Sequence, residues 1–213
     1  MRCAWPVLIC VTMPQKTQPA PIAPDVAPRG TALLVVDMIS CWDFPDGDKL
    51  VRGARRIAPN IAALKARCRE TGTPVIYAND NRGRWRSDFP TLVQESLERG
   101  GIAAEITRAL EPDRDDYFVL KPSHSAFFGT PLELLLRFLK VHRIAIAGVA
   151  SDQCVLSTAM EARMRSLEVV VPRDCVASQT TPRNNTVLRQ FEEVHQVPTM
   201  PGSRIRFDAE AEP

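Results

Sequence analysis

The most constraining feature of the sequence is an apolar run, residues 144–147, that passes within a few residues into a helical pattern. The run predicts a buried strand that ends at a turn near Gly148. Ser151 or Asp152 can cap the helix that follows, because either side chain accepts hydrogen bonds from free backbone N–H groups. Cys154 is therefore expected in the first turn of a helix at the carboxyl edge of a sheet.

The expected position of Cys154 suits a nucleophile. Unpaired backbone N–H groups and the positive end of the helix dipole favour a thiolate over a thiol, and the same N–H groups can bind an oxyanion. The alternative is a packing role under the helix, because free cysteine is among the residue types most often buried. The six cysteines of the chain show no CxxC motif and no Cys/His metal spacing, which predicts reduced thiols in a cytoplasmic protein.

Strand-like and helix-like segments alternate along the rest of the chain. Apolar runs predict further strands at residues 32–36, 74–78, 117–120 and 167–171. Helical spacing of apolar residues is found at residues 50–71, 91–110, 132–139 and 180–194, with a break at Gly100 and Gly101. This order predicts an α/β fold with three layers, α/β/α, around a mainly parallel, Rossmann-like central sheet.

Two of the predicted strands deliver an ionisable residue at their carboxyl ends. Asp37 follows the first of these runs and Lys121 follows the third. Because the carboxyl ends of parallel strands meet at one edge of a sheet, Asp37, Lys121 and Cys154 can converge in one crevice. A carboxylate at that depth is costly unless it is paired or functional, although Asp37 could also be a structural cap. Lys121 could equally be a surface residue whose stem lies along apolar groups.

Aromatic and polar residues follow the first two strands. Trp42 and Phe44 lie in a loop that is expected either to wall a pocket or to anchor itself in the core. The next loop, residues 79–89, contains three arginines and Trp85, which suits an anionic or planar polar substrate. A solvated loop held by its own Asp–Arg pairs explains the same residues. His124 is the only histidine with an expected view of the site.

Length and charge narrow the classes of partner. The 213 residues are expected to form one domain over residues 29–213, after a Pro-, Gln- and Ala-rich flexible extension over residues 1–28. The formal net charge of +2 provides no large field of one sign, which argues against nucleic acid and membrane surfaces as partners. No run reaches the roughly 18 apolar residues of a membrane span, so a small-molecule substrate is the expected partner.

Three segments together resemble the isochorismatase-like cysteine hydrolases, the superfamily that also contains nicotinamidases, carbamoylsarcosine amidase and ureidoacrylate hydrolases. The segments are residues 33–37, 121–127 and 148–155. The resemblance implies that Asp37 is the general base, Lys121 the cation that orders and polarises the site, and Cys154 the nucleophile. It also implies a cis peptide bond before Ala150, with the N–H groups of Ala150 and Cys154 forming an oxyanion hole.

The resemblance sets further expectations. No cofactor and no metal is expected, because Asp80-Asn81-Arg82 stands where nicotinamidases carry their metal motif, and no histidine lies in this loop. Met38-Ile39 replaces the x-Gln that often follows the family's aspartate, so one polar substrate contact is expected to be missing. Homo-oligomers are common in the family, and one is expected here. Substrate contacts are expected from Trp42, Asn81, Trp85, His124, Phe127 and Ser151.

The first functional hypothesis is a cysteine hydrolase that cleaves a C–N bond of a small amide, carbamoyl or ureido substrate through a thioester on Cys154. Two alternatives stay open. One is a vinyl-ether hydrolase of the isochorismate type, in which Asp37 protonates the substrate and the cysteine is dispensable. The other is a catalytically silent, small-molecule-binding member of the fold.

Overall fold

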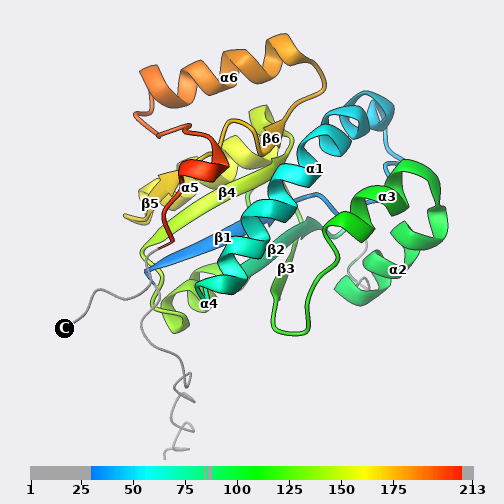
Figure 1. Cartoon of the computed structure of the whole chain (residues 1–213), viewed down its shortest axis with the longest axis horizontal. Helices are drawn as coiled ribbons and strands as arrows, with labels where there is room; N and C mark the ends of the chain where they lie inside the picture. Colours follow the sequence, from blue (N-terminus) through cyan, green and yellow to red (C-terminus); the bar gives the residue numbers. More distant parts are fainter. Residues whose placement is uncertain (1–29, 84, 86–87, 208–213) are drawn as a thin grey trace, which may run out of the picture.

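A computed structural model of the chain describes residues 30–83, 85 and 88–207 (Figure 1). In this part of the chain a six-stranded sheet has the order β3-β2-β1-β4-β5, and β6 pairs with β4. All the strand pairs are parallel. The strands are β1 Thr31–Val36, β2 Val75–Asp80, β3 Tyr117–Lys121, β4 Arg143–Val149, β5 Glu168–Val170 and β6 Val176–Ala177.

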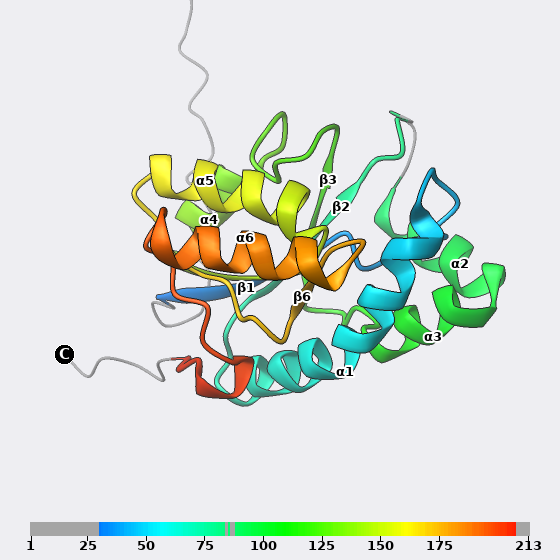
Figure 2. The same ribbon diagram turned by 90° about the horizontal axis from the view of Figure 1, so that it is seen from above.

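Helices cover both faces of the sheet. They are α1 Gly47–Glu70, α2 Phe89–Arg99, α3 Gly101–Ala109, α4 Leu132–Phe138, α5 Leu156–Met164 and α6 Thr181–Glu193, with a π-helical turn η1 at Ser151–Val155 and a 3-10 turn η2 at Gly202–Arg204. Figure 2 shows α1 and α3 on one side of the sheet and α4, α5 and α6 on the other. The predicted three-layer, mainly parallel α/β fold is confirmed.

The central strand β1 explains why two cores form. All six of its residues are buried, and alternate side chains enter different clusters. Leu33 and Val35 pack in the cluster that contains α1 and α3, whereas Leu34 and Val36 pack with α4, α5 and α6. A strand that is apolar at every position is therefore the expected sequence for this place in the fold.

Close contact between β1 and β4 requires a glycine at position 148. Gly148 has a φ of +115°, and a Cβ there would lie 2.1 Å from the carbonyl oxygen of Val36. Only glycine adopts this conformation without strain and without filling that space. The turn predicted at this residue thus ends β4 immediately before the segment that carries Cys154.

Several predicted boundaries differ from the structure. Helix α1 begins at Gly47, three residues earlier than expected, and β6 was not predicted, because two residues give no periodic signal. The expected cap by Ser151 or Asp152 is wrong: the residue that precedes η1 is Ala150, and no side chain caps the turn. The break between α2 and α3 at Gly100 agrees with the prediction.

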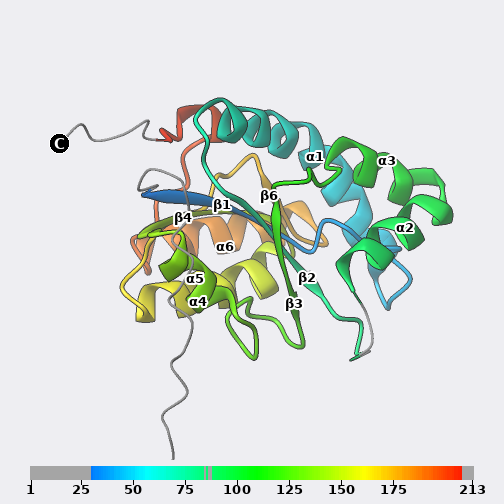
Figure 3. The ribbon, with the colours of Figure 1, turned by 90° about the horizontal axis from the view of Figure 1, so that it is seen from below.

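The carboxyl ends of β1, β2 and β3 and the loops that follow them lie at the same edge of the sheet (Figure 3). This edge is where ligands bind in parallel α/β sheets. The predicted extension over residues 1–28 lies outside the described residues. In the described part of the chain, no helix is both long enough and apolar enough to cross a membrane.

Candidate active site

Three ionisable groups from different strands meet at this edge. The Nζ of Lys121 lies 2.8 Å from Oδ2 of Asp37 and 3.4 Å from Sγ of Cys154. Asp37 directly follows β1, Lys121 is the last residue of β3, and Cys154 lies in η1 after β4. The predicted convergence of these three side chains in space is confirmed.

The Asp37 carboxylate is held in one orientation. Its Oδ2 faces Lys121, and its Oδ1 accepts a hydrogen bond of 2.8 Å from the backbone N–H of Asp80. Asp37 itself has a left-handed backbone conformation with a φ of 53°, which is uncommon for a residue other than glycine. Both carboxylate oxygens are therefore engaged, one by a group from β3 and the other by a group from β2.

The Lys121 ammonium is fully buried and fully charged. Burial alone would lower its pKa, but Asp37 and Cys154 reverse that effect and raise the pKa above its ordinary value. Its Nζ also donates to the carbonyl oxygen of Ser123 at 3.2 Å. A buried cation of this kind is stable only because anions and acceptors surround it.

The electrostatics of Cys154 differ from the expectation drawn from the helix N-terminus. Burial, and next the charge of Asp37, raise the pKa of the Cys154 thiol to about 12, while Lys121 opposes the shift. The Cys154 sulfur lies 3.4 Å from Nζ of Lys121 and 3.6 Å from Nδ1 of His124. Burial and the Asp37 charge therefore favour the thiol, against the thiolate that the helix N-terminus alone predicts.

The backbone around Cys154 forms a tight turn. The Val149–Ala150 peptide bond is cis, as the family resemblance implied. The N–H groups of Gln153 and Val155 donate to the carbonyl oxygen of Ala150 at 3.0 and 3.2 Å. The oxyanion hole expected from the N–H groups of Ala150 and Cys154 stays a prediction.

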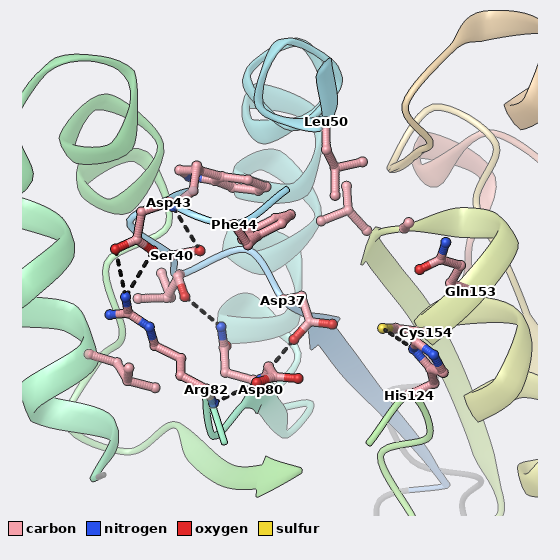
Figure 4. A pocket seen from close by; sticks show the side chains of 16 residues that line it. Asp37, Ser40, Asp43, Phe44, Leu50, Asp80, Arg82, His124, Gln153 and Cys154 are labelled. Atoms are coloured by element: carbon pink, nitrogen blue, oxygen red, sulfur yellow. Dashed lines mark hydrogen bonds and ion pairs between the residues drawn. The ribbon is translucent and has the colours of Figure 1, made fainter. Parts of the chain in front are cut away.

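A cavity of about 470 Å³ opens beside the sulfur (Figure 4). Its polar groups include Asp37, Asp80, His124 and Cys154. Its apolar wall comprises Ile39, Trp42, Phe44, Leu50 and Leu92. The reactive cluster thus lies at the surface of a pocket large enough for a small molecule.

Two of the six predicted substrate contacts line this pocket. His124 lies with its Nδ1 3.6 Å from the Cys154 sulfur, and Trp42 is nine-tenths buried in the apolar wall. The indole Nε1 of Trp42 and Oδ1 of the wall residue Asn79 are buried and have no hydrogen-bond partner among the described residues. The pocket wall therefore contains both a donor and an acceptor that are not used within the fold.

The other four predicted contacts lie outside the pocket lining. Trp85 is 82% exposed. Asn81 is buried, and its side-chain Oδ1 accepts a hydrogen bond from the N–H of Gly83. The Asn81 side chain therefore stabilises the turn of its own loop. Phe127 packs in the core and Ser151 is fully buried in η1. Their predicted substrate contacts are not supported by this geometry.

Sequence reasoning missed the charged residues on the far wall of the pocket. Arg82 donates two hydrogen bonds of 2.8 Å to Asp43 and one of 2.7 Å to Glu95. Arg82 is thus paired with carboxylates, but both lie outside its own loop, so the expected pairing within residues 79–89 is not what the structure shows for this arginine. Asp80 could have been found, because it ends β2 as Lys121 ends β3. Arg84 and Arg86 lie outside the described residues.

No group of three or more His, Cys, Asp and Glu side chains is arranged to hold a metal ion within residues 30–83, 85 and 88–207.

A family model described as the isochorismatase domain matches residues 31–200. The chain belongs to the isochorismatase family. Its members share the fold described above and include amidases.

Curated relatives of this isochorismatase-family hydrolase cover most of the domain. An uncharacterised isochorismatase family protein, YaaI of Bacillus subtilis, is 39% identical over 163 residues, which is 76% of this chain and 89% of that protein. A probable inactive nicotinamidase of Arabidopsis thaliana is 30% identical over 71% of this chain and 83% of its own length. The ureidoacrylate amidohydrolase RutB of Serratia proteamaculans is 31% identical over 70% and 69%.

Solved structures agree with the architecture. An isochorismatase family protein from Desulfovibrio vulgaris superposes with a TM-score of 0.67 at 24% identity, covering 82% of this chain and 95% of that chain. At this level of identity the likeness supports the fold alone.

Proposed function

We propose that this protein is a cysteine hydrolase that cleaves a C–N bond in a small amide, carbamoyl or ureido compound. The observation that carries the proposal is the Lys121 ammonium, which lies within 3.4 Å of both the Asp37 carboxylate and the Cys154 sulfur. A nucleophile and a base at the surface of one pocket, with an ordering cation buried behind them, are the groups that covalent acyl transfer requires.

In the first step the Cys154 sulfur attacks the substrate carbonyl carbon while its proton passes to Asp37. The raised pKa of the thiol favours this order of events, because proton removal is coupled to bond formation and no thiolate is stored beforehand. The carbonyl electrons move to oxygen, where the N–H groups of Ala150 and Cys154 would stabilise the charge.

In the second step the tetrahedral intermediate collapses. The C=O bond forms again, the C–N bond breaks, and Asp37 returns the proton to the departing nitrogen, which leaves as ammonia or an amine. The acyl group remains on Cys154 as a thioester. Asp37 then takes a proton from water, and the resulting hydroxide attacks the thioester. The C–S bond breaks to release the acid, and Asp37 returns its proton to the departing sulfur, which regenerates the thiol.

Lys121 acts on the base in this scheme. Its ammonium lies 2.8 Å from Oδ2 of Asp37 and opposes the rise in the pKa of the Cys154 thiol. It is enclosed by protein and absent from the pocket wall, so its role is to position and polarise Asp37 and Cys154. The amidohydrolase names among the curated relatives support the same class of reaction.

A panel of primary amides, N-carbamoyl amino acids and ureido acids tests the proposal through ammonia release. Wild type is expected to turn over at least one class, and Cys154→Ala is expected to be inactive but folded. Cys68→Ala is the matched control, because it also removes a buried thiol but lies on α1 outside the pocket. Full ammonia release by Cys154→Ala would refute the role of Cys154 as the nucleophile, and no turnover by wild type with an unreactive Cys154 would favour the silent alternative.

A further inference from the structure

The charges on the pocket wall are not balanced. Three carboxylates line the cavity, from Asp37, Asp43 and Asp80, and the guanidinium of Arg82 is the one Lys or Arg side chain among its described lining residues. His124 is the remaining titratable group apart from Cys154. A ligand in this pocket therefore faces more negative than positive charge.

The Arg82 guanidinium is already occupied. Its Nη2 is 2.8 Å from both carboxylate oxygens of Asp43, and its Nη1 is 2.7 Å from Oε2 of Glu95. Figure 4 shows the Arg82–Asp43 pair on the opposite side of the pocket from Cys154. Two carboxylates neutralise this cation, so its attraction for a third, carried by a substrate, is weak.

The Lys121 ammonium offers no alternative binding group for a substrate carboxylate. It is fully buried behind the wall, 2.8 Å from Asp37 and 4.0 Å from Oδ2 of Asp80. A substrate carboxylate that approached it would also approach both of those anions. The polar end of the pocket therefore suits N–H groups, because carboxylates are acceptors only.

The opposite part of the wall is apolar. Trp42 and Phe44 lie with ring centroids 6.2 Å apart, and Leu50 extends this surface (Figure 4). A flat or aliphatic group of the substrate can be buried there, while its amide nitrogen faces the acidic end.

We propose that the pocket selects a neutral or cationic amide or urea with an apolar substituent and discriminates against substrates that carry a carboxylate. The assignment of an amide or urea as the substrate rests on the function proposed above. The charge preference follows from the described residues of the pocket wall alone. RutB, by its name, acts on ureidoacrylate, which carries a carboxylate, so this protein is expected to differ from that relative in substrate charge.

The alkylation of Cys154 tests the charge preference without any substrate. Iodoacetamide and iodoacetate differ in charge and little in size, and peptide mass mapping reads the modification at Cys154. The quantity compared is the rate of labelling by iodoacetamide divided by the rate of labelling by iodoacetate. At low ionic strength and pH 9, we expect this ratio to be roughly tenfold higher for Cys154 than for free 2-mercaptoethanol. Added salt should reduce the preference. Equal rates, faster reaction with iodoacetate, or no labelling by either reagent would overturn the proposal.

Charge variants identify the responsible groups. Asp80→Asn and Asp43→Asn should each lower the preference for iodoacetamide, the first by removing an anion from the wall and the second by releasing Arg82 from its bidentate partner. Glu105→Gln is the matched control, since this exposed carboxylate pairs with Arg55 and does not line the pocket. An unchanged preference in both pocket variants, with each folded by circular dichroism, would refute the assignment.

A substrate series separates this inference from the proposed function. Phenylacetamide, its 4-aminomethyl derivative and its 4-carboxy derivative are compared by ammonia release, and benzylurea with the same substituents forms a second set. Higher kcat/KM for the neutral and cationic members supports the proposal, and a preference for the carboxylates refutes it while leaving the hydrolase function intact. If no member is hydrolysed by wild type, the proposed function fails and the alkylation ratio still decides the charge preference.

Discussion

Lys121 and Asp37 form an ion pair of 2.8 Å between a fully buried ammonium and a carboxylate whose side chain is 18% exposed. The pair links the ends of β1 and β3, two strands that are separated in the sheet by β2. It therefore contributes to the geometry of the site and to the stability of the fold, and the two contributions can be separated by experiment.

Replacing Lys121 by Met removes the cation and leaves the Asp37 carboxylate without its partner. We expect a loss of about 3 to 5 kcal/mol in the free energy of unfolding, as for other broken buried pairs. Activity should fall at least about a hundredfold, because the Asp37 base loses the ammonium that holds it in place. Urea denaturation and ammonia release measure the two effects.

Lys49→Met is the control for that variant. Lys49 pairs with Asp46 at 2.7 Å, but both side chains are about half exposed. An exposed pair of this kind contributes no more than about 1 kcal/mol. If the Lys121 and Lys49 variants lost equal stability, the account of the buried pair would be wrong.

The reactivity of Cys154 should depend on pH in an unusual way. Burial and Asp37 raise the pKa of its thiol to about 12, so the thiolate fraction is very small at neutral pH and grows with each unit of pH. The rate of iodoacetamide labelling is expected to rise about tenfold per pH unit from pH 7 to 10, without a plateau, whereas an ordinary cysteine levels off near its pKa of about 8.5. A plateau near pH 7 would contradict the assignment of a resting thiol.

Asp152 is expected to position the turn that carries Cys154. Its Oδ1 accepts a hydrogen bond of 2.5 Å from Ser178, and its Oδ2 accepts one of 2.7 Å from Nε of Arg183 on α6. Asp152→Asn should lower kcat by about ten- to a hundredfold through misplacement of the sulfur, with a smaller change in KM. Glu161→Gln, which loosens an exposed pair on α5, should leave kcat unchanged. Equal effects of the two variants on kcat would contradict the positioning role.

Gly148 provides a test of the backbone that supports the site. In Gly148→Ala the new Cβ would meet the Val36 carbonyl oxygen at 2.1 Å in a left-handed conformation, and we expect the free energy of unfolding to fall by more than about 3 kcal/mol. Gly83→Ala has a similar positive φ but nothing within 4 Å, so it should cost only about 1 kcal/mol. Thermal or urea denaturation distinguishes the two. A loss at Gly148 no larger than that at Gly83 would show that the close approach is unimportant.

The sequence was sufficient to place the three reactive side chains. Asp37 and Lys121 each follow or end an apolar run, and Cys154 follows another, so the parallel arrangement of the strands already brings them to one edge. The same reasoning could not predict that Arg82 pairs with Asp43 and Glu95, because those contacts join separate loops and a helix.

Local rules also failed where tertiary packing decides the outcome. A helix N-terminus alone favours a thiolate, but the burial of Cys154 and its contact with Asp37 outweigh that effect and raise its pKa. The sequence also did not indicate which loop aromatics are buried. Trp42 packs into the pocket wall, whereas the side chain of Trp85 is exposed. The expected homo-oligomer and the cytoplasmic location stay predictions.

The central claim is that Cys154 carries the acyl group during turnover. Rapid quenching of wild type in acid, followed by intact mass spectrometry and peptide mapping, measures this directly with any panel compound that releases ammonia. The account predicts a mass increase equal to the acyl fragment, confined to Cys154 and absent from Cys154→Ala. Turnover of that compound by Cys154→Ala at the wild-type rate, with no adduct on the wild-type sulfur, would contradict it.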